Sequence, residues 1–273
     1  MNKKSSLYIE LFKKILTGDH RLYNTEYFPL YKSRFISSIP LLFLDRFLRL
    51  KNHAICIIHN YKKEMFVEGK GWPTHADTMI GLKRLENIEQ CVEDILENNI
   101  PGDLMEAGVW RGGAAIFMRA LLKDKNIGNR IVWLADSFQG LPKPDPGRYP
   151  ADKGDKLYKF EELIVPLEDV KYNFEKYNLL DEQVKFLEGW FKDTLPSARV
   201  QQLALLRIDG DMYESTMDVL KNMYPKLSKG GYVIVDDYGG IPACKKAVHD
   251  YREQNNVTAK IETIDWTGVY WKK

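Results

Sequence analysis

Aspartates close two apolar stretches of this sequence. Residues 204–211 read ALLRIDGD, so an apolar run ends on Asp209, and Asp211 follows after one glycine. The stretch GYVIVDD, which ends on Asp236 and Asp237, repeats the pattern. One such aspartate is often a helix cap or a turn residue, and for Asp209 and Asp211 alone that explanation is as good as a functional one. Two strands that both end on acids favour a functional site.

The chemistry of this group follows from its charges. Three carboxylates at adjacent strand ends, Asp209, Asp236 and Asp237, repel one another unless they are protonated or bridged by a cation. No His or Cys flanks them, and oxygen ligands favour Mg²⁺ or a similar hard ion over zinc. A metal lowers the pKa of a hydroxyl, and Asp211 is then left to take its proton. We expect a metal-assisted reaction of a hydroxyl group.

A glycine-rich stretch, EAGVWRGGAAIF, starts at Glu106. Gly108 allows a tight turn, and Gly112 and Gly113 let the backbone approach a ligand at a helix start. The stretch is neither a G-x-G-x-x-G fingerprint nor a P-loop. Asp136 ends the next apolar strand, where a carboxylate can hold ribose hydroxyls. The acids suit the ammonium, sulfonium and ribose of S-adenosylmethionine.

Regular elements that position these residues are indicated by the hydrophobic pattern from residue 82 on. Strands are expected over 103–108, 130–138, 184–190, 203–209 and 231–237, and helices over 82–99, 112–124, 167–180, 215–227 and 242–255. The alternation predicts an α/β fold whose mostly parallel sheet has helices on both faces. Residues 260–273 predict two further strands joined at Trp266-Thr267-Gly268, which give the sheet an antiparallel edge.

Each of the five expected parallel strands ends on or beside a carboxylate: Glu106, Asp136, Glu188, Asp209 and Asp236. In open α/β sheets the ligand crevice lies outside the carboxyl ends of the strands. A core has no use for five unpaired acids. The acids therefore predict a ligand site at one edge of the sheet.

Composition is that of a soluble globular protein, with 44% hydrophobic and 29% charged residues among 273. No apolar run is long enough to span a membrane, and the N-terminus lacks the features of a signal peptide. The cysteines, Cys56, Cys91 and Cys244, are odd in number and far apart. This spacing argues against zinc and disulfides and predicts a cytoplasmic protein.

Charge is unevenly distributed. Residues 1–63 carry 12 Lys+Arg against 4 Asp+Glu, whereas the remaining residues carry 28 against 34. An acidic body argues against nucleic acid as a partner. The basic segment contains FISSIPLLFLDRFLRL, residues 35–50, which is apolar at helical spacing. We expect a helix that packs on the body or across a dimer, with peripheral contact to a membrane surface as the alternative.

Several stretches together closely resemble the macrocin O-methyltransferase family, the sugar O-methyltransferases of macrolide and aminocoumarin biosynthesis. They are GWPTHADTMIGLKRLENIEQ, GDLMEAGVWRGGAAIFMRALL, WLADSFQGLPKPD, YPADKGD, FLEGWFKDTLP, LALLRIDGDMYESTMDVL, YPKLSKGGYVIVDDYGGIPACKKAV and IDWTGVYWKK. The resemblance covers about residues 64–273. Residues 23–63 depart from the family pattern, which leaves the acceptor open.

The resemblance implies a class I S-adenosylmethionine-dependent methyltransferase. Its Rossmann-like domain, residues 83–273, would carry a mostly parallel seven-stranded sheet with an antiparallel C-terminal hairpin strand. Residues 1–82 would form an N-terminal helical lid segment. Such an enzyme transfers a methyl group from S-adenosylmethionine to a sugar hydroxyl, requires Mg²⁺ and is typically a homo-oligomer.

Site residues follow from the resemblance position by position. Asp209, Asp236 and Asp237 match the metal ligands, and Asp211 matches the general base. The cofactor-binding positions are Thr78, Met79, Glu106, Gly108, Val109, Trp110, Asp136, Ser137, Phe138, Gln139, Gly140 and Trp190.

Other functions fit parts of the pattern. The D-x-D at Asp209 and Asp211 also occurs in haloacid-dehalogenase phosphohydrolases and in sugar-nucleotide glycosyltransferases. The first class needs its D-x-D on an early strand, and the second leaves the glycine turn at Glu106 unexplained. Tyr172 and Lys176 form the Y-x-x-x-K of short-chain dehydrogenases, which we attribute to chance because no dinucleotide fingerprint accompanies it.

Overall fold

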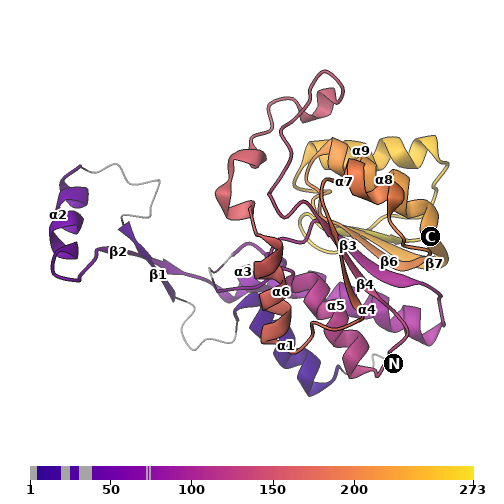
Figure 1. Cartoon of the computed structure of the whole chain (residues 1–273), viewed down its shortest axis with the longest axis horizontal. Helices are drawn as coiled ribbons and strands as arrows, with labels where there is room; N and C mark the ends of the chain where they lie inside the picture. Colours follow the sequence, from indigo (N-terminus) through magenta and orange to yellow (C-terminus); the bar gives the residue numbers. More distant parts are fainter. Residues whose placement is uncertain (1–4, 20–24, 31–38, 72, 74) are drawn as a thin grey trace.

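A central β-sheet organises the molecule in the computed structural model, which describes residues 5–19, 25–30, 39–71, 73 and 75–273 (Figure 1). The sheet has seven strands in the order β5-β4-β3-β6-β7-β9-β8. The strands are β3 (Asp103–Ala107), β4 (Val132–Asp136), β5 (Val184–Glu188), β6 (Leu203–Ile208), β7 (Leu227–Val235), β8 (Glu262–Thr263) and β9 (Val269–Lys272). The first five are parallel, and β9 runs antiparallel to both β7 and β8. The predicted α/β sheet is confirmed.

Helices cover both faces of the sheet and make three layers (Figure 1). One face packs against α1 (Leu7–Thr17), α4 (Leu82–Glu97), α5 (Gly113–Asp124) and α6 (Leu167–Lys176). The other packs against α7 (Phe191–Thr194), α8 (Tyr213–Met223), α9 (Pro242–Gln254) and the short turns η5 (Leu195–Ser197) and η6 (Tyr224–Lys226). Alternate strand residues feed the two cores: Leu104 faces the first and Met105 the second.

The sheet order creates a switch point between β3 and β6. The chain moves outward from β3 through β4 to β5, and then returns to lay β6 and β7 on the other side of β3. Ligands of doubly wound sheets bind outside the carboxyl ends of the strands at such a point. Glu106 lies near the end of β3, and Asp209 follows β6 directly, so the fold brings these two acids together.

Two segments lie outside the layers. The insertion between β4 and α6 contains three short turns, η2 (Pro150–Asp152), η3 (Leu157–Lys159) and η4 (Glu161–Leu163). The helix α3 (Lys63–Glu68) precedes α4.

Ile9, Phe12 and Leu16 of α1 belong to the core beside α4 and α5.

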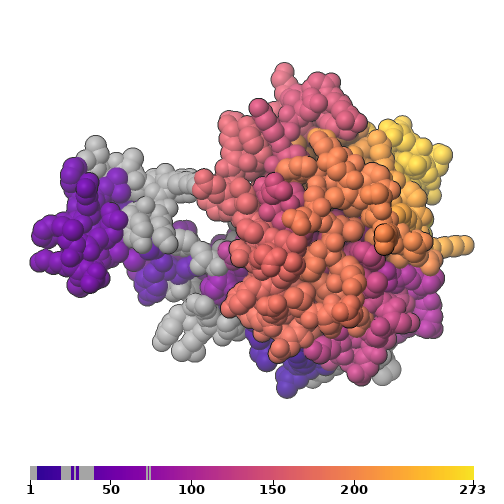
Figure 2. Space-filling view, viewed as in Figure 1, coloured from indigo at the N-terminus to yellow at the C-terminus, as the bar shows by residue number. Residues whose placement is uncertain are grey.

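A narrow arm projects from the body (Figures 1 and 2). It consists of the antiparallel pair β1 (Thr25–Pro29) and β2 (Cys56–Asn60), with α2 (Ile39–Arg49) at its far end. Large apolar side chains of α2 are exposed, among them Phe43 at 69% and Phe47 at 56%. Only part of the segment predicted as residues 35–50 lies within the described residues, and that part is helical from residue 39 to 49.

The described residues include no helix long and apolar enough to cross a membrane. Cys56, Cys91 and Cys244 are free thiols, as their spacing predicted.

Candidate functional site

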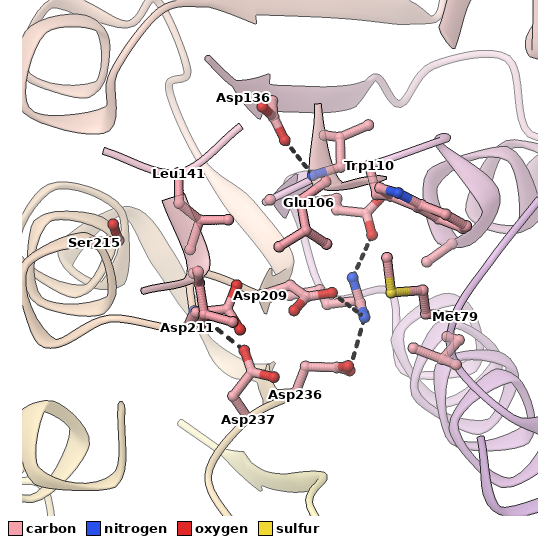
Figure 3. Close-up of a pocket in the computed structure, with 18 of the residues that line it drawn as sticks. Met79, Glu106, Trp110, Asp136, Leu141, Asp209, Asp211, Ser215, Asp236 and Asp237 are labelled. Atoms are coloured by element: carbon pink, nitrogen blue, oxygen red, sulfur yellow. Dashed lines mark hydrogen bonds and ion pairs between the residues drawn. The ribbon is translucent and has the colours of Figure 1, made fainter. Parts of the chain in front are cut away.

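A large cavity opens at the carboxyl ends of the parallel strands; we call it the strand-end pocket. Its volume is about 880 Å³, within the range of roughly 300–1,000 Å³ that is usual for ligand sites. Residues 77–80, the glycine turn, the insertion and the β8–β9 turn all line it. Figure 3 shows the four aspartates, Asp209, Asp211, Asp236 and Asp237, grouped toward one end, with Asp136 at the other.

Almost every site residue predicted from the sequence lines this pocket. The lining includes Thr78, Met79, Glu106, Gly108, Val109, Trp110, Asp136, Ser137, Gly140, Trp190, Asp209, Asp211, Asp236 and Asp237. Phe138 and Gln139 are the exceptions: the Phe138 ring is buried against Phe186, and Gln139 is exposed. Glu188 ends β5 but is exposed and lies outside the lining, so four of the five strand-end acids reach the pocket.

Glycine is required where β3 turns into the next loop. Gly108 has φ +90°, and a Cβ there would come within 1.7 Å of the Asp209 carbonyl oxygen. The turn therefore presses against the first residue after β6, which places the glycine loop and the aspartates in one wall of the pocket.

Glu106 anchors this turn from inside the protein. Its side chain is 1% exposed. One carboxylate oxygen accepts a hydrogen bond from the Ala115 backbone N–H at 2.8 Å, and the other accepts from Arg207. Burial raises the pKa of Glu106 to about 8, with Arg207 acting against it. Both oxygens thus hold the first turn of α5 and β6 together.

Asp136 also fixes backbone. Its carboxylate accepts hydrogen bonds from the Val109 and Phe138 backbone N–H groups, each at 2.7 Å. Burial raises the pKa of Asp136, and these hydrogen bonds oppose the rise. The carboxylate therefore shapes the loops after β3 and β4. Its expected bond to ribose hydroxyls, which would use the remaining lone pairs, stays a prediction.

The three aspartates expected to bind a metal do come together. Asp209, Asp236 and Asp237 each offer one carboxylate oxygen, and these oxygens lie within 4.8 Å of one another. Burial first, and then the neighbouring carboxylates, raise the pKa of Asp209 and of Asp237. The crowding is the kind that a cation relieves, and the all-oxygen donor set fits a hard divalent ion such as Mg²⁺.

Two buried arginines, which the sequence analysis did not single out, balance these acids. Arg207 of β6 pairs with Glu106, with Asp209 at 2.8 Å and with Asp236 at 2.7 Å. Arg84 of α4 pairs with Asp236 as well. Burial tends to raise the pKa of Asp236, but both guanidinium groups outweigh it, and the pKa is lowered. The sequence signal that could have identified Arg207 is a lone arginine inside an apolar strand, because a buried charge needs partners.

Arg84 also ties the C-terminal hairpin to the site. Its guanidinium donates to Asp265 at 2.7 Å and to the Thr267 hydroxyl. These two residues belong to the turn between β8 and β9, and Trp266 between them lines the pocket. The hairpin turn is thereby fixed beside Asp236.

Asp211 lies beside the three clustered aspartates but is not one of the three whose oxygens meet (Figure 3). Its backbone has φ +55°, an uncommon conformation for a residue other than glycine, and its N–H donates to Asp237 at 3.2 Å. Burial and the charges of Asp209 and Asp155 raise the pKa of Asp211 to about 8. A carboxyl group with this pKa can accept or give a proton near neutral pH.

The insertion holds Asp211 in place through the helix that follows it. Asp152 of η2 is 2% exposed. It accepts hydrogen bonds from the backbone N–H groups of Tyr213 at 2.7 Å and Glu214 at 3.0 Å. It thus caps the start of α8 from a distant part of the chain, and the stretch YPADKGD gains a structural role.

The fold and the site define a class I S-adenosylmethionine-dependent methyltransferase: a seven-stranded sheet with an antiparallel last pair, a glycine turn after the first parallel strand, and an acid at the end of the second. A sequence profile of the Macrocin-O-methyltransferase (TylF) family matches residues 5–273. The chain belongs to this family and is an O-methyltransferase.

Relatives of this chain are named as O-methyltransferases of natural products. The chain is 48% identical over 273 residues to the demethyldecarbamoylnovobiocin O-methyltransferase of Streptomyces niveus, covering 100% of this chain and 95% of the relative. It is 50% identical over 216 residues to the mycinamicin III 3''-O-methyltransferase of Micromonospora griseorubida, covering 78% and 85%. The structure of the O-methyltransferase NovP has a TM-score of 0.82 and 47% identity and covers 99% of both chains.

These matches correct one expectation. Residues 23–63 were predicted to depart from the family, but the profile starts at residue 5 and the relative from S. niveus aligns over the whole chain. Short apolar and basic stretches offered too few recognisable motifs for this region. Membership of the O-methyltransferase family also argues against the phosphohydrolase and glycosyltransferase alternatives.

Proposed function

We propose that this protein transfers the methyl group of S-adenosylmethionine to a hydroxyl of a sugar or sugar-bearing natural product or glycan, and that the reaction depends on Mg²⁺. The observation that carries the proposal is the grouping of Asp211 with Asp209, Asp236 and Asp237 in one wall of the strand-end pocket (Figure 3). The names of the relatives support the acceptor class: they are O-methyltransferases of novobiocin, tetracenomycin and mycinamicin compounds, and the tetracenomycin compound is named with a rhamnosyl group.

The half of the pocket around the glycine turn would bind the cofactor. Asp136 lies beside the turn and would hold the ribose hydroxyls, and Thr78, Met79 and Trp190 line the same cavity. Both carboxylate oxygens of Glu106 already accept hydrogen bonds, from Arg207 and from the Ala115 backbone. We therefore assign Glu106 the role of holding the glycine turn in place rather than of contacting the cofactor directly.

Asp209, Asp236 and Asp237 would hold the metal. A bound divalent cation lowers the pKa of a hydroxyl that coordinates it. Asp211 would then receive the hydroxyl proton on its carboxylate, which lies beside the proposed metal ligands (Figure 3). The remaining task of the protein is positioning, because methyl transfer needs donor and acceptor in line.

The acceptor would enter between the insertion and the C-terminal hairpin. Leu141, Leu157, Phe160 and Leu163 of the insertion line this side of the pocket, as does Trp266 of the hairpin. An apolar wall beside a cluster of aspartates suits a polar sugar attached to a less polar body.

We further assign the catalytic chemistry to residues 83–273 and a covering role to residues 1–82, in a cytoplasmic homo-oligomer without nucleic-acid partners. The exposed apolar side chains of α2 and the excess of basic residues before residue 64, opposite an acidic body, support contact between copies. Contact of residues 35–50 with an anionic membrane surface is the alternative use of this arm.

A methyl-transfer assay tests the proposal. The purified protein is incubated with S-adenosylmethionine, Mg²⁺ and a set of glycosides, and products are identified by mass spectrometry and NMR. We expect methylation on a sugar hydroxyl, loss of turnover with a chelator and recovery with added Mg²⁺. The aglycones without their sugars serve as matched controls. Methylation of an aglycone, or turnover that a chelator leaves unchanged, would overturn the sugar or the metal assignment respectively.

A further inference from the structure

Asp77 is a buried carboxylate in the segment that covers the glycine turn. Its exposed fraction is 6%, and it precedes Thr78 and Met79, which line the pocket. The Lys176 ammonium donates to both of its carboxylate oxygens, at 2.8 and 2.7 Å, and the Tyr177 hydroxyl donates to one of them. Both partners come from the end of α6, so a contact about a hundred residues apart in sequence holds this segment.

The segment is pressed directly onto the expected cofactor site. A Cβ at Gly113, the first residue of α5, would lie 2.4 Å from the Asp77 carbonyl oxygen and 2.5 Å from the Thr78 Cβ. Arg111 of the glycine loop donates to the Ala76 carbonyl oxygen at 2.7 Å. We call residues 76–79 the cover segment. It has no helical or strand hydrogen bonding of its own, so its position depends on such contacts.

The same helix is joined to the glycine loop and the insertion. Asn173 of α6 donates to the Arg111 carbonyl oxygen at 3.0 Å. On the other side, the Trp110 indole N–H donates to the Glu162 carbonyl oxygen at 2.9 Å, and Glu162 lies in the insertion that leads into α6. Cover segment, glycine loop and insertion therefore close on one another around the cofactor half of the pocket.

The contact with Asp77 is a charged pair at the rim of the cavity. Lys176 keeps 38% of its side chain exposed while Asp77 is buried. Removing the partners would leave a buried carboxylate unpaired, which costs far more than the pair contributes on an open surface. The segment would then relieve the charge by moving Asp77 toward water, and Thr78 and Met79 would move with it.

We propose that Lys176 and Tyr177 are positioning residues that latch the cover segment, through Asp77, over bound S-adenosylmethionine. This inference rests on the proposed function. It gives Lys176, which the sequence analysis attributed to a chance motif, a role in retaining the cofactor rather than in the chemistry.

Calorimetry with S-adenosylhomocysteine on the full-length protein tests the latch. For Lys176→Met we expect at least a tenfold rise in Kd, a faster release of the ligand, and a KM for S-adenosylmethionine that rises while kcat changes little. Lys176→Arg, which retains a charged donor, should recover most of the affinity. Lys171→Met is the matched control: Lys171 is on the same helix, its ion pair among the described residues is with the exposed Glu168, and its loss should leave Kd unchanged.

A second variant keeps the test decisive. Tyr177→Phe removes the other donor but keeps the ring, which packs edge-on against Phe12 with centroids 4.9 Å apart. If Lys176→Met does not fold, a several-fold rise in Kd in Tyr177→Phe supports the latch. Folded variants with wild-type affinity and release rate overturn it. A wild-type protein that binds no S-adenosylhomocysteine contradicts the proposed function itself, which is a different result.

Discussion

Single residues in this site are governed by the balance of buried charge. Arg207 pairs with three carboxylates at the ends of three strands, and Arg84 shares Asp236 with it. The arginines balance the charge of the acids, which allows them to be buried together. Asp237 and Asp211 form no ion pair with either arginine among the described residues, and burial and the neighbouring carboxylates raise the pKa of both. A bound cation would relieve this crowding at Asp237, whereas the raised pKa of Asp211 suits proton transfer.

Asp211→Asn separates proton transfer from binding. The amide keeps the shape of the side chain but is no longer a useful base. We expect kcat to fall by about 10²–10⁴-fold, the usual worth of a general base. The Kd for S-adenosylhomocysteine should stay within about twofold, as measured by calorimetry, because Asp211 lies toward the opposite end of the pocket from Asp136 (Figure 3). Equal kcat in the two proteins would remove Asp211 from the mechanism.

At the scale of elements, much of the architecture could be predicted from the sequence. The parallel strands and the helices that flank them have clear periodicity and clear ends. The order of the elements, and the edge of the sheet that carries the acids, could therefore be predicted from the hydrophobic pattern. The contacts of Arg84, Asp152 and Asp77 could not be predicted. Each joins elements far apart in the chain, and a single sequence carries no signal for such pairing.

Helix α5 is held to the start of β5 by an ion pair that predicts a pH effect. Arg119 Nε lies 3.0 Å from an Asp181 oxygen, and the hydrogen bond from Arg119 lowers the pKa of Asp181. A carboxylate whose folded pKa is below its unfolded value stabilises the protein above the unfolded pKa, near 4, and loses that effect as pH falls. Asp181 is 39% exposed, so we expect Asp181→Asn to lower the free energy of unfolding at pH 7 by no more than about 1 kcal/mol.

The dependence on pH distinguishes this ion pair from simple packing. The free energies of unfolding of wild type and Asp181→Asn, measured with urea, should converge as pH falls below 4, because the wild-type carboxylate becomes protonated there. A difference in the free energy of unfolding that stays constant from pH 7 to acid would show that charge is not its source.

The whole molecule combines an acidic catalytic body with a basic, apolar arm. Five of the residues 39–63 are Lys or Arg and one is acidic. The apolar face of α2 is exposed in the isolated chain. Exposed apolar surface of this kind usually marks an interaction site. We therefore expect the arm to be covered in the working protein.

Phe43→Glu with Phe47→Glu tests which surface covers it. Both side chains are exposed, so the double variant should keep the thermal stability of the folded body. Analytical ultracentrifugation should show an oligomer for wild type and a monomer for the variant. A monomeric wild type that floats with anionic vesicles, and a variant that does not, would instead assign α2 to a membrane surface.

The claim on which the account depends is that the strand-end pocket binds the methyl donor. Calorimetric titration of the purified wild-type protein with S-adenosylmethionine, repeated on Asp136→Ala, tests it most directly. We predict one binding site per chain and a strong loss of affinity in the variant, because Asp136 holds the loops after β3 and β4 and faces the cofactor half of the pocket. No binding to a protein shown to be folded would contradict the methyltransferase account.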